Sequence, residues 1–175
     1  EIVDIYTRAS QASALVPPSI AFLLDREDRT DTEIADVDRQ THGRVKFLDR
    51  RMIENYLLDA EALSSVLRDA LDPADQVPSA ADVRAWITAH GNDDKYHASR
   101  HETLSQAWLT HVHAGKLLRD LFADLTAARI EFRKTVHSPA ILERLLRASP
   151  DAVSQLRERV RECHALLPEP HAAAQ

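Results

Sequence analysis

Apolar residues form two short runs near the start of the chain, separated by one amphipathic segment. Residues 20–24 and 45–48 are each too short for a stable helix and are typical of buried strands. Between them, the sequence Thr-Asp-Thr-Glu at residues 30–33 is a typical helix start, and Gly43 is a typical stop. Two strands joined through one helix predict a right-handed βαβ unit, with both strand ends at the same edge of a parallel sheet.

The apolar positions after Asp59 recur at helical spacing, as do those of residues 1–10. Prolines punctuate the later part of the chain and separate its helices. The helices are expected at residues 60–71, 80–90, 101–112, 115–126, 139–148 and 152–166. The sequence therefore predicts a helix-rich α/β chain: a partial, small parallel sheet within residues 1–60, a helical subdomain over residues 61–167 and a frayed tail at residues 168–175.

Composition agrees with a single soluble domain or two small ones. The chain has 175 residues, of which 44% are hydrophobic and 29% charged, with only 3 glycines. A formal charge of -6 argues against a surface that binds nucleic acid everywhere, but leaves room for a local basic groove. The lone Cys163 cannot form an intramolecular disulfide, and neither a membrane span nor a signal peptide is recognisable, so a cytoplasmic location is expected.

Acidic residues directly follow the first predicted strand. Carboxylates at the carboxyl end of a buried strand cannot pack inward cheaply, so Asp25, Glu27 and Asp28 are expected to face a crevice where a cation offsets their repulsion. Hard oxygen ligands suit Mg²⁺ or Mn²⁺. In an extended backbone Asp25 and Glu27 point to the same side, which makes them the better pair. An ordinary solvated turn is the alternative interpretation.

Glu54 lies just beyond the second predicted strand, in the first turn of an expected helix. The βαβ topology would let it meet Asp25 at the sheet edge. A glutamate in a first helical turn is also favoured by the helix dipole without any chemistry.

Basic residues supply further candidates. Lys116 follows Gly115 at the head of an amphipathic helix, where a cation is unfavourable unless it meets an anion such as phosphate. Arg133, Lys134 and His137 form a second basic patch that could follow a nucleic-acid backbone, although a solvated helix end explains them equally well. The nine histidines show no zinc-binding pattern, and no phosphate-binding glycine loop or serine-hydrolase motif is present.

Three segments together resemble the C-terminal Toprim-like domain of OLD-type ATPase-nucleases. They read I-A-F-L-L-D-R-E-D-R at residues 20–29, R-R-M-I-E-N-Y-L-L-D at 50–59 and G-K-L-L-R-D-L-F at 115–122. The resemblance implies a Mg²⁺-dependent nuclease domain joined to an upstream ABC-type ATPase, often in anti-phage defence. It assigns Asp25, Glu27 and Glu54 to the metal, and Lys116 to the charge that develops on the scissile phosphate.

The chain departs from this family pattern in two places. The family's D-x-D motif is Asp25-x-Glu27 here, which keeps the charge and lengthens one arm. The family also has an earlier glutamate on a preceding strand, and we expect that ligand to be missing, because Glu1 opens directly into a helical pattern. A start at Glu1 rather than Met further suggests a piece of a larger protein, with removal of a tag as the alternative explanation.

Together these observations predict metal-dependent hydrolysis of phosphodiester bonds. The resemblance implies DNA as the substrate, and the sequence does not separate DNA from RNA. The alternative is a non-catalytic interaction or dimerisation module of an ATP-binding protein, which docks an ATPase or a second copy of the chain. The missing glutamate and the acidic net charge favour this alternative.

Overall fold

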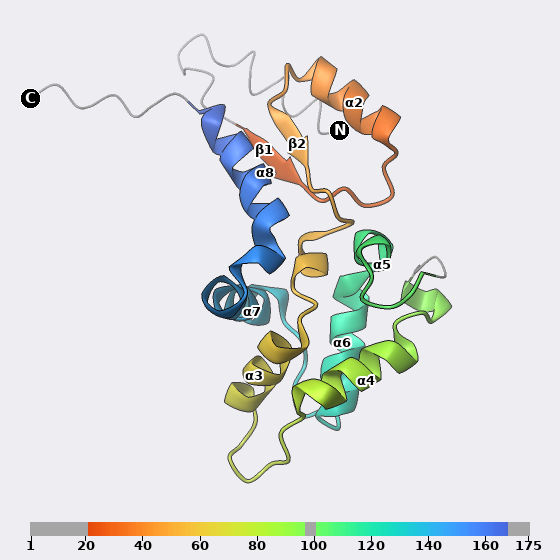
Figure 1. Ribbon diagram of the computed structural model, residues 1–175, viewed down its shortest axis with the longest axis vertical. Helices are drawn as coiled ribbons and strands as arrows, with labels where there is room; N and C mark the ends of the chain where they lie inside the picture. Colours follow the sequence, from red (N-terminus) through yellow and green to blue (C-terminus); the bar gives the residue numbers. More distant parts are fainter. Residues whose placement is uncertain (1–20, 97–100, 168–175) are drawn as a thin grey trace, which may run out of the picture. The chain divides into compact units, whose positions relative to one another are not determined.

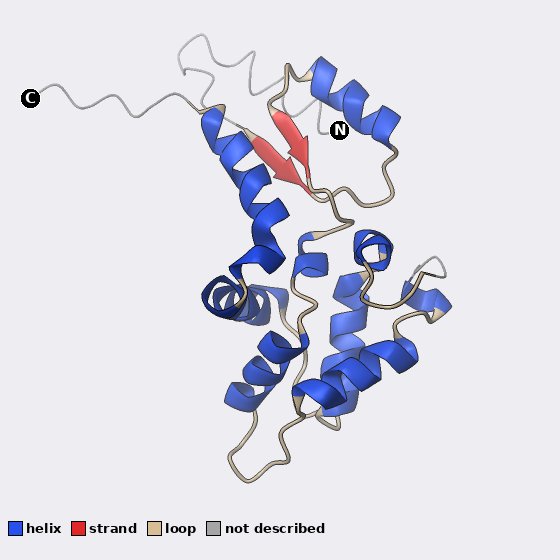
Figure 2. Ribbon diagram, in the orientation of Figure 1, coloured by secondary structure: helices blue, strands red, loops and turns tan. Residues whose placement is uncertain are grey.

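Two parallel strands and a connecting helix form the first part of the fold. The computed structural model describes residues 21–96 and 101–167. In it, strand β1 (Phe22–Leu24) pairs in parallel with β2 (Val45–Phe47) (Figures 1 and 2). In this pairing Leu24 lies opposite Phe47. Helix α2 (Asp31–Gln40) connects them. The βαβ unit expected from the apolar runs is therefore confirmed. The expected helix near residue 1, the first residue of the first predicted strand and the tail lie outside the described residues.

Local signals in the sequence explain where α2 begins and ends. Thr30 and Glu33 form a capping box: the Glu33 amide donates to the Thr30 hydroxyl, and the Glu33 carboxylate accepts from the Thr30 backbone amide at 2.8 Å. These hydrogen bonds lower the pKa of Glu33. The chain leaves the helix through Gly43, whose φ of 74° suits glycine. Lys46 of β2 then ties the strand to the helix through an ion pair with Asp38 at 2.8 Å.

A helix from the far end of the chain completes this part of the structure. The chain divides into two compact units, and residues 155–167 belong with residues 21–48. Helix α8 (Ser154–Ala165) lies against the sheet, with the Cys163 thiol 3.8 Å from the Phe22 carbonyl oxygen. Burial raises the pKa of this half-buried free thiol. The first unit thus includes α8, which the sequence analysis assigned to the helical subdomain.

The second unit, residues 49–154, is helical. Its helices begin after side chains that accept hydrogen bonds from the first turn, such as Asp59, Ser79 and Ser105. They pack around a core that includes Tyr96 and Trp108, both fully buried. The elements of this unit are the 3₁₀ turn Ile53–Tyr56, α3 (Ala60–Ala70), α4 (Ala80–His90), the 3₁₀ turn Asp94–Tyr96, α5 (Gln106–His111), α6 (Ala114–Leu125), α7 (Lys134–Ala148) and the 3₁₀ turn Pro150–Val153.

Two helix boundaries and the type of one element differ from the sequence-based expectation. The helix expected to begin at Pro139 begins at Lys134, because the His137 imidazole accepts a hydrogen bond from the Arg133 backbone amide and starts the helix one turn early. The helix expected over residues 101–112 is the shorter α5, and Glu54 lies in a 3₁₀ turn instead of an α-helix. Of the helices in residues 21–96 and 101–167, none combines the length and the apolar character that a membrane crossing needs.

Gly91 permits a close approach that any side chain would prevent. A Cβ atom there would lie 2.5 Å from the Ile87 carbonyl oxygen and 2.9 Å from the Trp108 ring. We predict that Gly91→Ala lowers the free energy of unfolding by about 1–3 kcal/mol, as expected for overpacking. Urea denaturation is the measurement, with Thr88→Ala on the exposed face of α4 as the control, where a change within about 0.5 kcal/mol is expected. Equal stability of the two variants would contradict the packing described for Gly91.

Candidate functional site

Asp25 leaves the sheet at the edge where the two parallel strands end. Leu24 and Phe47 are paired, and the Leu48 amide donates to the Leu24 carbonyl at 2.9 Å, so the strands run together up to Asp25. The Asp25 residue is half-buried, and its carbonyl accepts a hydrogen bond from Arg29. The backbone of Asp25 thus occupies the carboxyl edge of the sheet, the position that the sequence analysis gave it.

The backbone beyond Asp25 does not continue as a strand. Glu27 lies in a turn with φ of 52°, and both Glu27 and Asp28 are exposed. The alternation of an extended chain, which made Glu27 the expected partner of Asp25, therefore does not apply at Glu27. Its carboxylate instead lies 3.3 Å from the Arg29 guanidinium, which also stacks over the Phe47 ring at 5.3 Å. Arginine thus already offsets part of the negative charge of this turn.

Glu54, in the second unit, is the most deeply buried of the predicted metal ligands. Only 1% of the residue is exposed. Its Oε1 atom lies 2.9 Å from the Lys134 ammonium, whereas Oε2 is buried and has no hydrogen-bond partner among the described residues. A buried carboxylate requires a compensating charge, and Lys134 supplies it. The second oxygen leaves one acceptor unused.

The residues around Glu54 hold its turn rigidly in place. The Asn55 side-chain amide donates to the carbonyls of Leu109 and Val112, each at 2.8 Å. The buried Arg50 guanidinium donates to the Asn55 carbonyl at 2.8 Å and lies over the Tyr56 ring at 4.5 Å. Burial lowers the pKa of Arg50 and raises that of Tyr56. Asn55 thus braces the turn, and Tyr56 belongs to the core.

The first turn of α6 lies close to Lys134 at Gly115. A Cβ atom on Gly115 would lie 3.5 Å from the Lys134 Cε atom and 3.5 Å from the Met52 sulfur. The Gly115 amide faces that sulfur at 3.4 Å, and a thioether is a weak acceptor. Lys116 is half-buried, and its amide approaches the His113 imidazole at 3.4 Å. Lys134 thus contacts the Glu54 carboxylate. The role expected of Lys116, at the scissile phosphate, stays a prediction.

The basic patch expected from Arg133, Lys134 and His137 does not form as one surface. Arg133 is largely exposed, and its guanidinium is 4.0 Å from Glu131. His137 is only 8% exposed, and it packs against the rings of Phe122 and Phe132. Its Nδ1 atom accepts from the Arg133 amide at 2.8 Å, so His137 braces the start of α7 and is not available on the surface for a nucleic-acid backbone.

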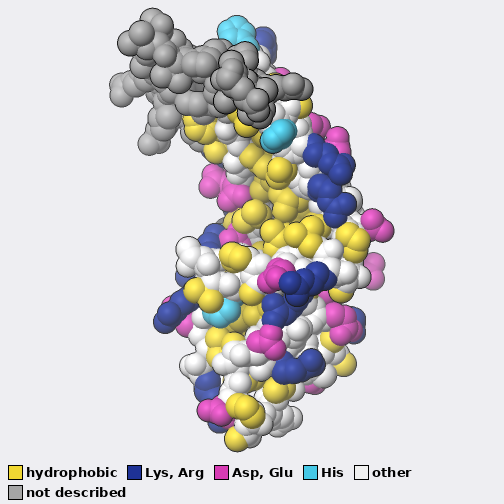
Figure 3. Space-filling view, turned by 90° about the vertical axis from the view of Figure 1, so that its left-hand side faces the viewer, with side chains coloured by type: hydrophobic (Ala, Val, Ile, Leu, Met, Phe, Trp, Pro, Cys, Tyr) yellow, Lys and Arg dark blue, Asp and Glu magenta, His cyan; other side chains and the backbone are white. Residues whose placement is uncertain are grey.

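Charges of both signs alternate over the helices of the second unit. In the lower part of Figure 3, Lys and Arg side chains are interspersed with Asp and Glu. Ion pairs between helices account for part of this pattern: Arg84 lies 3.0 Å from Glu61, and Arg144 pairs with Asp69. The face that is drawn there does not present a continuous basic surface.

The donor types of Asp25, Glu27 and Glu54 fit Mg²⁺ or Mn²⁺, because all three are carboxylates and Glu54 keeps a buried oxygen with no partner among the described residues. Within the described residues of either unit, no group of three or more His, Cys, Asp or Glu side chains is arranged to hold a metal ion. Asp25 and Glu54 belong to different units. Their meeting around one ion stays a prediction.

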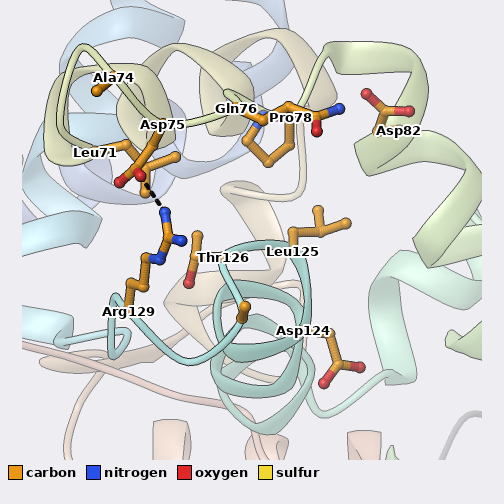
Figure 4. A pocket seen from close by; sticks show the side chains of 11 residues that line it. Leu71, Ala74, Asp75, Gln76, Pro78, Asp82, Asp124, Leu125, Thr126 and Arg129 are labelled. Atoms are coloured by element: carbon orange, nitrogen blue, oxygen red, sulfur yellow. Dashed lines mark hydrogen bonds and ion pairs between the residues drawn. The ribbon is translucent and has the colours of Figure 1, made fainter.

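A separate pocket of about 510 Å³ lies where the connection between α3 and α4 faces the end of α6 (Figure 4). Arg129 and Asp75 pair on one side of it, and on the other Asp124 accepts a hydrogen bond from the Trp86 indole at 3.1 Å. None of the predicted catalytic or metal-binding residues lines it. The lining residues are Leu71, Ala74, Asp75, Gln76, Pro78, Asp82, Asp124, Leu125, Thr126, Ala127 and Arg129.

Comparisons with protein-family models, with curated proteins and with solved structures find no match to this chain. The resemblance to the Toprim-like domain of OLD-type nucleases therefore stays a prediction, which depends on the three quoted segments.

Removing the Asn55 brace tests whether the Glu54 turn is held as described. In Asn55→Ala the buried carbonyl of Val112 and the partly buried carbonyl of Leu109 lose their donor, so we predict a loss of about 2–3 kcal/mol in the free energy of unfolding. Urea denaturation measures it. The control is Asn92→Ala, because Asn92 is exposed and donates one hydrogen bond to the His101 carbonyl. If both variants lose the same small amount, Asn55 does not act as a brace.

The pH dependence of stability tests the role of His137. Burial, with a contribution from nearby Arg133, lowers the pKa of His137 below its usual value of 6.5. The unfolded chain therefore binds the proton more tightly, and protonation favours unfolding. The stabilisation from neutral His137 is complete above about pH 6.5 and is lost as the pH falls toward the lowered pKa of the folded state.

We predict that the free energy of unfolding changes less between pH 7.5 and pH 5.5 in His137→Gln than in the parent chain. These two values lie about one unit on either side of the usual histidine pKa. The exposed His90 of α4 provides the control variant, His90→Gln, which should keep the parental pH dependence. An unchanged pH dependence in His137→Gln would contradict the assigned role.

Proposed function

We propose that this chain is a nuclease domain that hydrolyses phosphodiester bonds in DNA with Mg²⁺ or Mn²⁺. The observation that carries the proposal is the parallel pairing of β1 and β2, which sets Asp25 at the carboxyl edge of the sheet, where ligands of parallel sheets gather. The buried Glu54 carboxylate, with one oxygen unpartnered among the described residues, is a second group of the required type.

The proposed roles follow from the chemistry of each group. Asp25, Glu27 and Glu54 would hold the ion by their carboxylate oxygens. When bound, the metal lowers the pKa of a water molecule and offsets charge on the phosphate. Lys116, near the start of α6, is proposed to donate hydrogen bonds to the phosphate oxygens as negative charge develops. In the hydrolysis, a water oxygen bonds to phosphorus, the bond to one ester oxygen breaks, and that oxygen leaves with a proton.

The wider setting is also part of this proposal. An ABC-type ATPase domain upstream would control the nuclease, the whole protein would act in the cytoplasm in anti-phage defence, and a homodimer is a natural arrangement for it. These elements come from the resemblance of residues 20–29, 50–59 and 115–122 to OLD-type proteins.

A second candidate function is a non-catalytic interaction or dimerisation module. One observation favours it: Lys134 already neutralises Glu54, so this carboxylate has a structural explanation that needs no metal. Val136 and Leu146 of α7 are also exposed, at 55% and 47%, and offer apolar surface to a partner.

Plasmid nicking with and without Mg²⁺ separates the two functions. We predict that Asp25→Asn and Glu54→Gln each reduce the nicking rate by about 100-fold or more, because a metal-bound carboxylate cannot be replaced by an amide without loss of charge. Asp36→Asn is the matched control, since Asp36 is an aspartate of the first unit that pairs with Arg39 on the surface of α2.

The outcomes have distinct meanings. Equal nicking by the parent and all variants indicates a contaminating nuclease and contradicts the proposal. Absence of nicking, together with absence of Mn²⁺ binding in isothermal titration, favours the interaction module.

A further inference from the structure

We infer that His101 and His111 form a surface site for one transition-metal ion of the kind that imidazole nitrogens bind, namely Zn²⁺, Ni²⁺ or Cu²⁺. Both histidines belong to the second unit. The site is independent of the proposed nuclease function, because its ligands are nitrogens, whereas Mg²⁺ is held by oxygens.

The two imidazole rings lie at a distance that one shared ion can span. Their centroids are 6.0 Å apart. An ion lies about 2.0–2.1 Å from the imidazole nitrogen that binds it, which is about 3.2 Å from the ring centroid and allows two rings on one ion to be up to about 6.4 Å apart. The observed separation falls within this limit. Rotation of the exposed side chains about their own bonds is therefore enough to close the chelate.

The backbone holds both histidines in place without an ion. The Asn92 side-chain amide donates to the His101 carbonyl at 3.0 Å. After His101 the chain turns, and the Ser105 amide donates to the Glu102 carbonyl at 3.1 Å. His111 belongs to α5, the helix that Ser105 caps. Little further ordering of the backbone therefore opposes the binding of an ion.

The turn between the two histidines contains a strained residue. Leu104 has a φ of 66°, in the left-handed region that residues other than glycine rarely adopt. Strain of this kind costs free energy and is concentrated at ligand sites and other functional positions. The turn brings together His101 and His111, which are too far apart in the sequence to form a metal-binding motif on one helix.

Both rings are available to an ion. The two residues are exposed, and no hydrogen bond or ion pair within the described residues engages either ring. Neutral imidazole is the commonest metal ligand among side chains. Only two protein groups take part, since the described residues hold no larger group of metal-ligating side chains, and water molecules complete the coordination.

An ion shared by the two rings would link the turn at residues 102–105 to the last turn of α5. Helix α5 also supplies the Leu109 carbonyl to which Asn55 donates, so the link would support the same part of the second unit. An ion that binds the folded chain and not the unfolded one shifts the folding equilibrium toward the folded state.

Isothermal titration of the chain without a histidine tag tests the site. Zn²⁺ and Ni²⁺ are the probes, and excess Mg²⁺ is present to occupy carboxylates. His101→Gln and His111→Gln should each weaken binding at least about 10-fold, since loss of a ligand costs no less than loss of a group that supports a ligand. His164→Gln is the control and should bind as the parent does, because His164 is an exposed histidine of α8 in the first unit.

Thermal unfolding gives a second measurement. Zn²⁺ should raise the Tm of the parent and of His164→Gln, and should leave the Tm of His101→Gln and His111→Gln unchanged. The inference is overturned if the parent binds neither Zn²⁺ nor Ni²⁺, or if either His101→Gln or His111→Gln binds them as tightly as the parent. Plasmid nicking with Mg²⁺ is measured separately, so the failure of one proposal is distinguishable from the failure of the other.

Discussion

A carboxylate taken out of water needs an opposite charge, and this constraint organises the part of the second unit around Glu54. The 3₁₀ turn that carries Glu54 is fixed by Asn55, whose amide satisfies two carbonyls near the end of α5. The Lys134 side chain, which pairs with Glu54, runs beside Gly115 in the first turn of α6. The starts of two helices and one turn are thus coupled through one ion pair, which a change at any of these residues would disturb.

The first unit depends on the covering of its small sheet by helices. A sheet of two short strands cannot bury enough surface alone, and it needs helices to cover it. Helix α2 supplies one, anchored by its capping box and by the Lys46–Asp38 ion pair. Helix α8 supplies another from the opposite end of the sequence, where Arg44 donates to the Leu166 carbonyl at 3.5 Å. This unit is therefore closed by residues more than a hundred positions apart.

Much of the fold could be predicted from the sequence because its signals are local. The two apolar runs, the Thr30–Glu33 capping box and the Gly43 stop define the βαβ unit, and the prolines bound several of the helices. The placement of Asp25 at the end of the sheet follows from that topology. The sequence analysis did not predict the turn at Glu27. Glu27 has a positive φ, and no glycine, the residue that usually indicates such a φ, stands at this position.

The other features of the structure depend on contacts that the spacing of residue types along the sequence does not predict. The pairing of Glu54 with Lys134 joins residues far apart in the sequence, and no motif indicated it. The early start of α7 depends on the His137 imidazole, which acts as an acceptor for a backbone amide in a way that charge-based reasoning does not foresee. The acidic Glu131, which lies near Arg133, indicates that residues 131–137 carry charges of both signs.

The placement of the aromatic residues has an optical consequence. Both tryptophans of the chain belong to the second unit: Trp108 is enclosed beside Gly91, and Trp86 donates to Asp124. Indole emission therefore reports on the helical unit alone, while the strands and their two covering helices contain no such chromophore. Comparing fluorescence with far-ultraviolet dichroism during denaturation would reveal whether the two units melt together or one at a time.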